Sequence, residues 1–279
     1  MKKIVWISSY PKSGNTWIRY FLCNYFYNQD RKNSDFDLLN KIDKFPPYKY
    51  MQAIANEEVI KESAYNVSKY WLKIQSEITK TPDEFIFVKN HNALVSIEGR
   101  NLTDQTYSLA FIYIVRDPRD IAVSYSNFDK TLSINRTIER ITSKHLHCHI
   151  SKKNIFDVEV LGSWKFNYLS WKNGVPEIPR IIIRFEDLIK NTYKTKLKII
   201  KFLSKNVGSK IDEEQIKFSI DQSSFDRLKE IEKIKKFPES SNKFFNSGKI
   251  GQWKNFLSHS QVEKIENFCK EEMQELNYL

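Results

Sequence analysis

The chain has 279 residues, of which 41% are hydrophobic and 28% are charged, and this ordinary composition excludes a disordered, collagen-like or membrane-embedded class. The formal net charge is +11, but no tight basic cluster with interleaved aromatic residues occurs, so we predict a solvated surface that attracts anionic small molecules and no nucleic-acid partner. The three cysteines are widely separated and no apolar run approaches the ~20 residues of a membrane span, so we predict a cytoplasmic protein without disulfides or a membrane partner.

The first predicted element is a short apolar strand over 4–8, which Pro11 and Gly14 break before a helix that begins near Thr16. Further strands are predicted in chain order over 85–88, 109–115 and 180–184, and further helices at 56–79, 158–173, 192–206 and 261–275. Strands that alternate with helices predict βαβ units, and therefore an α/β fold in three layers with a central parallel sheet flanked by helices.

Two other segments, 30–50 and 129–156, look irregular or partly helical, and we expect substrate-facing loops there. No internal repeat, low-complexity tract or Pro-, Gly- or Ser-rich linker divides the chain. We therefore predict a single domain over 1–279.

The segment Tyr10–Trp17 joins the first strand to the first helix. Backbone N–H groups and the helix N-terminus converge there on one anion-sized position. Lys12 adds a mobile cation, and short donors come from three neighbours, Ser13, Asn15 and Thr16. The Walker pattern expected of a nucleotide kinase is absent, because Lys12 precedes Gly14 instead of following it. The sequence therefore predicts a P-loop-like anion-binding loop, with an ordinary strand–turn–helix corner as the structural alternative.

This segment resembles the 5′-phosphosulfate-binding loop of the sulfotransferases that use 3′-phosphoadenosine 5′-phosphosulfate (PAPS). The resemblance implies a phosphosulfate-binding loop whose residues are Lys12, Ser13, Gly14, Asn15, Thr16 and Trp17. It also implies that PAPS is the donor co-substrate, that 3′-phosphoadenosine 5′-phosphate (PAP) is the product, and that no metal is needed.

The segment from Val115 to Tyr125 resembles the family's 3′-phosphate-binding segment, which implies that Arg116 and Ser124 bind that phosphate. Arg116 follows a strand, at the sheet edge where ligands of α/β folds bind, and its planar guanidinium suits a phosphate. Asp117 can cap the next helix and Pro118 can occupy its first turn. The structural alternative is an Arg116 paired with Asp120.

The end of the second strand, from Val88 to His91, resembles the family's Lys-x-His catalytic segment. A lone histidine is more often structural, but the two phosphate segments favour catalysis here. The resemblance implies that His91 takes the acceptor proton, that Lys12 stabilises the bridging oxygen of the leaving phosphate, and that Lys89 holds the sulfonate oxygens.

Three further residues, Phe185, Ser223 and Phe225, match segments that contact adenine in the family, with plain core packing as the alternative. The segment 244–255 is similar to a loop that closes over the 3′-phosphate and implies contacts from Asn246, Ser247 and Gly248. Asn246 and Ser247 replace the usual Arg and Lys there, which predicts weaker donor binding. Lys249 or Lys243 is a candidate for compensation.

Two other patterns are weighed against function. His145, His147, Cys148 and His149 suggest zinc, but no spaced partner accompanies them, and we favour a loop at the acceptor entrance. Residues 254–263 resemble the family's dimer segment only at its ends, so a homodimer stays open beside a simple helix start that Ser258 or Ser260 caps.

These observations predict in-line transfer of a sulfuryl group from PAPS to a hydroxyl or amine of a small-molecule acceptor. The alternative is a non-catalytic nucleotide-binding protein that retains the anion loop. A nucleotide kinase is disfavoured by the Walker mismatch, and a nucleic-acid binder by the dispersed charge.

Overall fold

The computed structural model describes residues 3–129, 131–151, 154–237, 244–245 and 248–279. It divides the chain into two compact units, each assembled from separate stretches of sequence. Unit 1 comprises 1–10, 43–115 and 139–182, and unit 2 comprises 11–42, 116–138 and 183–279. The single domain over 1–279 stays a prediction.

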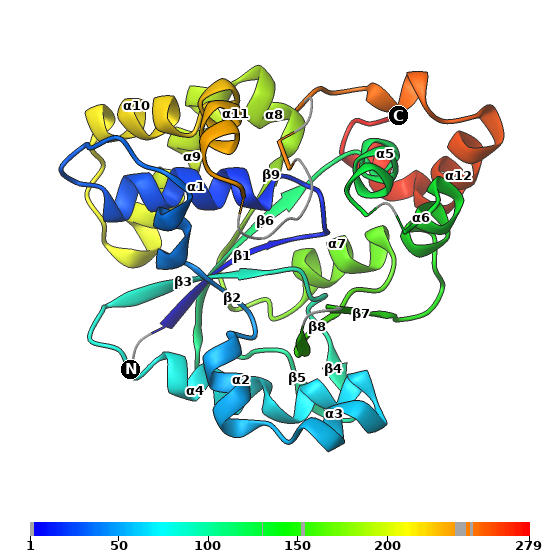
Figure 1. Ribbon diagram of the computed structural model, residues 1–279, viewed down its shortest axis with the longest axis horizontal. Helices are drawn as coiled ribbons and strands as arrows, with labels where there is room; N and C mark the ends of the chain where they lie inside the picture. The colour runs from blue at the N-terminus through cyan, green and yellow to red at the C-terminus, as the bar shows by residue number, and fades with distance from the viewer. Residues whose placement is uncertain (1–2, 130, 152–153, 238–243, 246–247) are drawn as a thin grey trace. The chain divides into compact units, whose positions relative to one another are not determined.

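Unit 1 contains most of a five-stranded sheet, which Figure 1 shows. Its strands are β1 (Lys3–Ser9), β2 (Asp43–Lys44), β3 (Phe85–Asn90), β6 (Ser108–Val115) and, at the boundary with unit 2, β9 (Arg180–Arg184), in the order β2-β3-β1-β6-β9. β1 pairs in parallel with both β3 and β6, and β2 pairs in parallel with β3. The four predicted strands are therefore confirmed, because continuous apolar runs suit a sheet that is buried on both faces.

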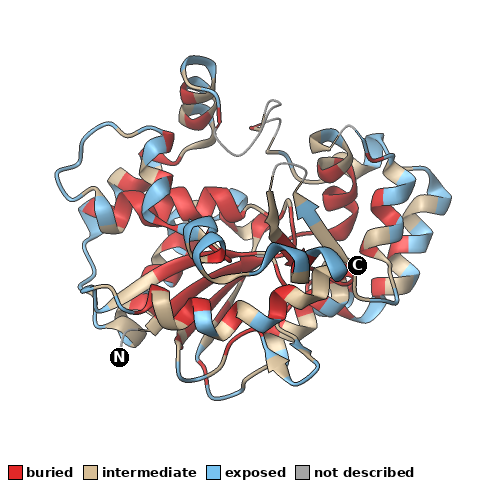
Figure 2. Cartoon of the chain, turned by 60° about the horizontal axis from the view of Figure 1, so that its bottom comes forward, coloured by how far each residue is buried: buried red, intermediate tan, exposed pale blue. Residues whose placement is uncertain are grey.

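The core of unit 1 forms where α7 (Trp164–Asn173) packs against the sheet. The Trp171 ring lies 4.9 Å from that of Phe111 on β6 and 6.3 Å from that of Trp6 on β1, and Trp6 also meets Phe45 at 5.0 Å. Figure 2 shows the strands of the sheet as mostly buried. Aromatic rings of this size supply much of the area that folding removes from water.

One predicted helix, 56–79, is broken into three pieces in the structure. These are α3 (Glu57–Glu62), the 3₁₀-helix η2 (Ala64–Tyr70) and α4 (Trp71–Ile78). Ser63 is extended, with φ of −158°, and its side chain accepts a hydrogen bond from the amide of Tyr65. The serine therefore ends one helix and caps the next, which the apolar periodicity did not indicate.

The predicted helix over 158–173 is wrong at its start. Residues up to Val160 belong to β8 (Asn154–Val160), which pairs in antiparallel fashion with β7 (Cys148–Ser151). Gly162 has φ of +68° and Ser163 caps α7, so the helix begins at Trp164. Apolar and charged residues alternate from Phe156 to Val160, which is a strand pattern that the helix prediction overlooked.

The two segments predicted as irregular or partly helical are partly helical. The first contains the 3₁₀-helix η1 (Phe36–Lys41) and the start of α2 (Tyr48–Ile54), and the second contains α6 (Ile134–Ile141). A small hairpin of β4 (Ser96–Ile97) and β5 (Arg100–Asn101) completes unit 1.

Unit 2 is mainly helical. Its elements besides η1 and the first part of α6 are α1 (Asn15–Tyr27), α5 (Pro118–Phe128), α8 (Phe185–Lys190), α9 (Thr192–Val207), α10 (Glu213–Gln222), α11 (Phe225–Ile234), the 3₁₀-helix η3 (Gln252–Asn255) and α12 (His259–Glu275). The predicted helices that begin near Thr16 and at 192 and 261 are confirmed as α1, α9 and α12, and Ser258 with Gln261 forms a capping box at the last. α8, α10 and α11 were not predicted. In the described part of the chain, no helix combines the length and apolar character that crossing a membrane requires.

Candidate active site

The predicted anion loop lies in unit 2 and ends at the N-terminus of α1. Gly14 precedes the helix with φ of +98°, and a glycine has no side chain with which to cap the first-turn amides. These N–H groups are positioned to bind an anion. Lys12 has φ of +68°, a left-handed conformation that costs a non-glycine residue about 1 kcal/mol and that occurs preferentially at functional sites.

Four of the predicted donor-binding residues converge next to this loop. The Phe185 ring packs so closely on Gly14 that a Cβ atom there would lie 2.6 Å from its Cδ2 atom. The same ring meets that of Trp17 edge-on at 6.0 Å, and the Arg116 guanidinium stacks over it at 4.3 Å. The structure therefore brings Gly14, Trp17, Arg116 and Phe185 together.

Arg116 connects the loop to the C-terminal segment of unit 2. It is only 5% exposed, and its guanidinium donates to the carbonyl oxygens of Lys12 at 3.1 Å and Lys249 at 3.2 Å. Burial lowers the pKa of Arg116, whereas the charges of Asp120 and Glu186 raise it. A guanidinium remains protonated under these conditions and supplies a fixed positive charge.

The sequence offers Asp120 as an ion-pair partner of Arg116, but the hydrogen bonds of its carboxylate go to backbone amides of the C-terminal loop. Its carboxylate accepts from the amides of Gly251 at 2.7 Å and Trp253 at 3.1 Å, so it fixes the C-terminal loop on the first turn of α5. Asp117 caps that helix and Pro118 begins it, as predicted. The nearest sequence signal for Asp120 was its place in the Arg-Asp-Pro-Arg-Asp run.

Ser13 and Lys12 have contrasting environments. The Ser13 hydroxyl is fully buried and has no hydrogen-bond partner among the residues that the structure describes. It is therefore suited to donate a hydrogen bond to an oxygen of a bound anion. The Lys12 ammonium lies 3.8 Å from the centre of the Phe128 ring and 4.3 Å from that of Phe244. Asn15 and Thr16 are buried in the first turn of α1.

The remaining donor-binding predictions lie elsewhere in unit 2. Ser124 is partly buried on α5. Ser223 is fully buried at the end of α10, where its hydroxyl accepts from Lys196 at 2.8 Å and donates to a carbonyl oxygen, while its own carbonyl accepts from the Trp17 indole. Phe225 begins α11 and packs on Gly248, where a Cβ would lie 2.7 Å from the ring. Asn246, Ser247 and Lys243 lie outside the described residues.

His91 and Lys89 lie in unit 1, at the end of β3. The Nδ1 atom of His91 is 2.8 Å from the carbonyl oxygen of Ser9 on β1. Because a carbonyl oxygen only accepts, Nδ1 carries the proton and Nε2 keeps the lone pair. The pKa of His91 is lowered to about 4, mainly by burial. The charge of Glu159 raises this pKa and that of Lys89 lowers it. His91 is therefore neutral near pH 7 and able to accept a proton at Nε2.

Sequence reasoning missed a buried ion pair close to His91. Lys44 on β2 contacts Glu159 at 2.9 Å and Asp157 at 2.6 Å, both on β8, and the Glu159 side chain is only 4% exposed. Burial raises the pKa of Glu159, but the charges of Lys44, His91 and Lys89 outweigh it and hold that pKa at about 2. Glu159 lies within the stretch for which the sequence analysis predicts a helix.

The histidine-rich tract runs into β7, which begins at Cys148. His147 is partly buried, and burial lowers its pKa. Within the ranges that the structure describes, no group of three or more His, Cys, Asp or Glu side chains is arranged to hold a metal ion. The prediction that the protein needs no metal stays a prediction.

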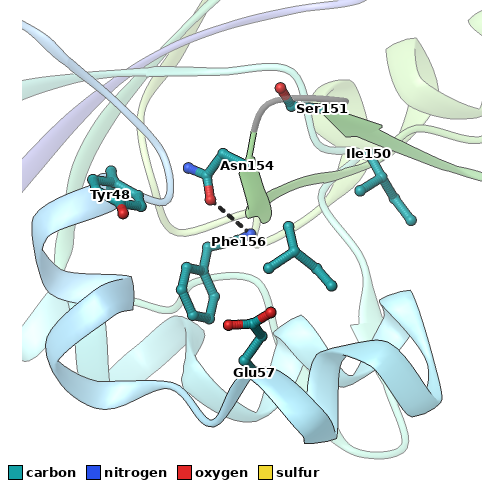
Figure 3. Close-up of a pocket in the computed structure, with 7 residues that line it drawn as sticks. Tyr48, Glu57, Ile150, Ser151, Asn154 and Phe156 are labelled. Atoms are coloured by element: carbon teal, nitrogen blue, oxygen red, sulfur yellow. Dashed lines mark hydrogen bonds between the residues drawn. The ribbon is translucent and has the colours of Figure 1, made fainter.

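A cavity of about 460 Å³ lies in unit 1 between helices α2 and α3 and the β7–β8 hairpin (Figure 3). Tyr48 and Glu57 line it from the helices, and Ile150 and Phe156 line it from the hairpin. The two segments predicted to face a substrate, 30–50 and 129–156, therefore both contribute to its wall.

Comparison with known proteins agrees with the resemblance. The family model for the sulfotransferase domain matches residues 2–277. Sulfotransferase 1B1 of Mus musculus is 30% identical over 172 residues, an alignment that covers 58% of this chain and 53% of that protein. Amine sulfotransferase of Oryctolagus cuniculus is 22% identical over 97% of this chain and 81% of its own length, and cytosolic sulfotransferase 1 of Danio rerio is 24% identical over 96% and 81%.

Among solved structures, mouse sulfotransferase SULT7A1 complexed with PAP matches with a TM-score of 0.61 and 19% identity. The match covers 98% of this chain and 84% of that one. At this identity the likeness shows the fold, and it confirms the predicted α/β class with a central parallel sheet flanked by helices.

Proposed function

This chain belongs to the PAPS-dependent sulfotransferase family, and from that premise we propose that it transfers the sulfuryl group of PAPS to a hydroxyl or amine of a small-molecule acceptor. The proposal is carried by the convergence of Gly14, Trp17, Arg116 and Phe185 in unit 2. Two relatives support it by their names: the mouse structure is complexed with PAP, and the rabbit protein is an amine sulfotransferase.

The donor site that we propose uses residues of unit 2 only. The amides that follow Gly14 and the buried Ser13 hydroxyl are suited to the phosphosulfate, and Arg116 is suited to the 3′-phosphate. The Phe185 and Trp17 rings offer apolar area for adenine. PAPS, when bound, supplies an activated sulfuryl group, and the neighbouring residues supply charge and orientation.

Transfer of this kind passes through a loose transition state in which negative charge grows on the departing phosphate oxygen. We assign Lys12 to that oxygen and Lys89 to the sulfonate oxygens, because a preformed cation stabilises charge as it develops. His91 takes the acceptor proton at Nε2, since Nδ1 is held by Ser9. The transferred group forms its new bond to the acceptor oxygen or nitrogen as the bond to phosphate breaks.

We propose further that the cavity beside Tyr48 and Phe156 binds the part of the acceptor distant from the reacting atom. The rings of Tyr48 and Phe156 line this cavity, so an acceptor with an apolar body is favoured.

The partner and location proposals are narrower. We propose a cytoplasmic protein because a zebrafish relative is named cytosolic sulfotransferase 1. A homodimer, and the absence of nucleic-acid and membrane partners, remain predictions. The second candidate function, a nucleotide-binding protein without turnover, is favoured by Asn246 and Ser247, which replace two cations of the family's phosphate loop.

One experiment separates these functions. Calorimetry measures binding of PAP, ATP and a random oligonucleotide, and a radiosulfate assay then measures transfer from PAPS to a broad acceptor panel. We expect binding of PAP and transfer to at least one acceptor, loss of both in Lys12→Ala, and loss of transfer with retained PAP binding in His91→Ala. PAP binding without any transfer identifies the non-catalytic protein, and no PAP binding overturns the family function.

A further inference from the structure

A cluster of ionisable side chains in unit 1 includes the proposed base. It consists of Lys44, Lys89, His91, Asp157 and Glu159, which come from β2, β3 and β8 and the residue after β3. The conventional roles of the family account for Lys89 and His91 and leave the other three without a function.

The end of β8 is fastened to the chain that follows His91. The amide of Val160 donates to Asn92 Oδ1 at 2.6 Å, and the amide of Ala93 donates to the Val160 carbonyl at 2.8 Å. Asn167 donates to the carbonyls of both His91, at 3.0 Å, and Leu161, at 3.2 Å. Glu159 directly precedes Val160, so the position of its backbone relative to His91 is fixed by several hydrogen bonds.

Lys44 fixes the other end of the Glu159 side chain. Its ammonium contacts Glu159 Oε1 at 2.9 Å, and its own backbone is placed by the pairing of β2 with β3, where Lys44 lies opposite Lys89. Glu159 raises the pKa of Lys44, and Lys44 lowers the pKa of Glu159, so both groups stay ionised together. Asp157 shares the same ammonium but is 29% exposed, against 4% for Glu159.

The charges that act on His91 have opposite signs. Glu159 favours the protonated imidazole, while Lys89 and Lys44 disfavour it, and Nδ1 of the ring also contacts the carbonyl oxygen of Ser9 at 2.8 Å and its hydroxyl at 3.2 Å. Asp157 is not among the strongest influences on the ring. Without Glu159, the strongest charges that act on His91 would be the two ammonium groups of Lys89 and Lys44.

We propose that Glu159 is a positioning residue for the reaction: its carboxylate, held by Lys44, is the counter-charge for the imidazolium that forms at His91. The inference rests on the proposed function of His91 as base. In the step, the acceptor O–H or N–H proton moves to Nε2, the acceptor–sulfur bond forms, and the sulfur–oxygen bond to phosphate breaks. Glu159 takes no proton and remains a carboxylate throughout.

The test compares Glu159→Gln with Asp157→Asn across a pH–rate profile. Loss of the carboxylate makes His91 a weaker base, so we expect kcat to fall about tenfold and the acid limb of kcat/KM to move to lower pH by about one unit, with the KM for PAPS unchanged. Asp157→Asn should leave the acid limb in place. Glu159→Asp, which keeps the charge, should restore the wild-type limb.

A fall in rate without movement of the limb in Glu159→Gln indicates a structural role and overturns the proposal. A second readout is independent of turnover: NMR titration of the His91 ring, assigned by its loss in His91→Ala, in wild type and Glu159→Gln. We expect a lower pKa in the variant, and an unchanged pKa overturns the inference. If the wild type transfers no sulfate while that pKa moves, the proposed function fails and the electrostatic coupling stands.

Discussion

Gly14 meets two constraints at once, and each has a separate cost. Its φ of +98° disfavours any side chain, and a Cβ would collide with the Phe185 ring at 2.6 Å. We expect Gly14→Ala to lower the free energy of unfolding by about 2–4 kcal/mol, the sum of left-handed strain and overpacking. Urea unfolding measures this change.

Gly208 is the matched control, because it has φ of +72° and nothing lies within 4 Å of its built Cβ. Gly208→Ala should cost only the backbone term of about 1–2 kcal/mol. Equal losses in the two variants would show that the Phe185 contact contributes nothing.

Lys196 is a fully buried lysine on α9 whose ammonium donates to Ser223 and lies over the rings of Trp17 and Phe21. Burial lowers its pKa to about 7 from 10.5. Between these two values the unfolded chain binds more protons than the folded one, so stability rises with pH across this window. Below pH 7 Lys196 is protonated in both the folded and the unfolded chain. The free-energy cost of burying its charge is therefore constant there, and at its largest.

Lys196→Met removes that cost. We expect the variant to be more stable than wild type near pH 6 and the difference to shrink between pH 7 and pH 10, as measured by urea unfolding at several pH values. Exposed Lys201→Met serves as the control for loss of one lysine and should show no such trend. A constant difference across the window would contradict the lowered pKa.

At the scale of elements, Asp120 joins α5 to the loop before η3 through the amides of Gly251 and Trp253. Asp120→Asn replaces one acceptor oxygen by an NH₂ group that faces an N–H donor. We expect hydrogen exchange at these two amides to accelerate about tenfold, equivalent to loss of ~1.4 kcal/mol of local stability, as seen by NMR or mass spectrometry.

The control is Asp221→Asn, a change on the exposed face of α10. It should leave exchange at Gly251 and Trp253 unaltered. PAP affinity is a second readout, because Arg116 also contacts this loop at Lys249. Unchanged exchange in Asp120→Asn would mean that other contacts suffice to hold the segment.

Elements that one local signal defines were predictable from the sequence. Apolar runs revealed the four strands, and Asp117 with Pro118 marked the start of α5. Two kinds of boundary were not predictable. One depends on a competing local hydrogen bond, as at Ser63, and the other on a left-handed residue, as at Gly162. β8 was misassigned although its residues from Phe156 to Val160 alternate apolar and charged, which is a strand pattern. The pattern does not show that Glu159 is buried against Lys44, a partner more than a hundred positions away.

The candidate site divides in the same way. Gly14, Trp17, Arg116 and Phe185 were found through motifs, and the structure brings them together. Glu159 and Lys196 carry no motif, since their significance comes only from burial next to other groups. Burial of a charge is a tertiary property, which a one-dimensional pattern does not contain.

The formal net charge of +11 over the entire chain should draw anionic donors to the protein. Raising the ionic strength from ~0.05 to ~0.5 M shortens the Debye length from about 14 to about 4 Å, so we expect PAP affinity to fall several-fold. Adenosine, which has no phosphate, is the matched probe and should respond little. If PAP affinity did not change with ionic strength, the net charge would not contribute to PAP binding, and contacts within the site alone would account for it.

The two units alternate along the chain, and this order has a consequence for biosynthesis. The ribosome releases Gly14 and Trp17 early, whereas their contact Phe185 follows roughly 170 residues later, which is about ten to thirty seconds at ~5–20 residues per second. During that interval the first helix exists without the aromatic ring against which it packs. The nucleotide should therefore begin to protect the nascent chain only after Phe185 has been released, about two thirds of the way through synthesis.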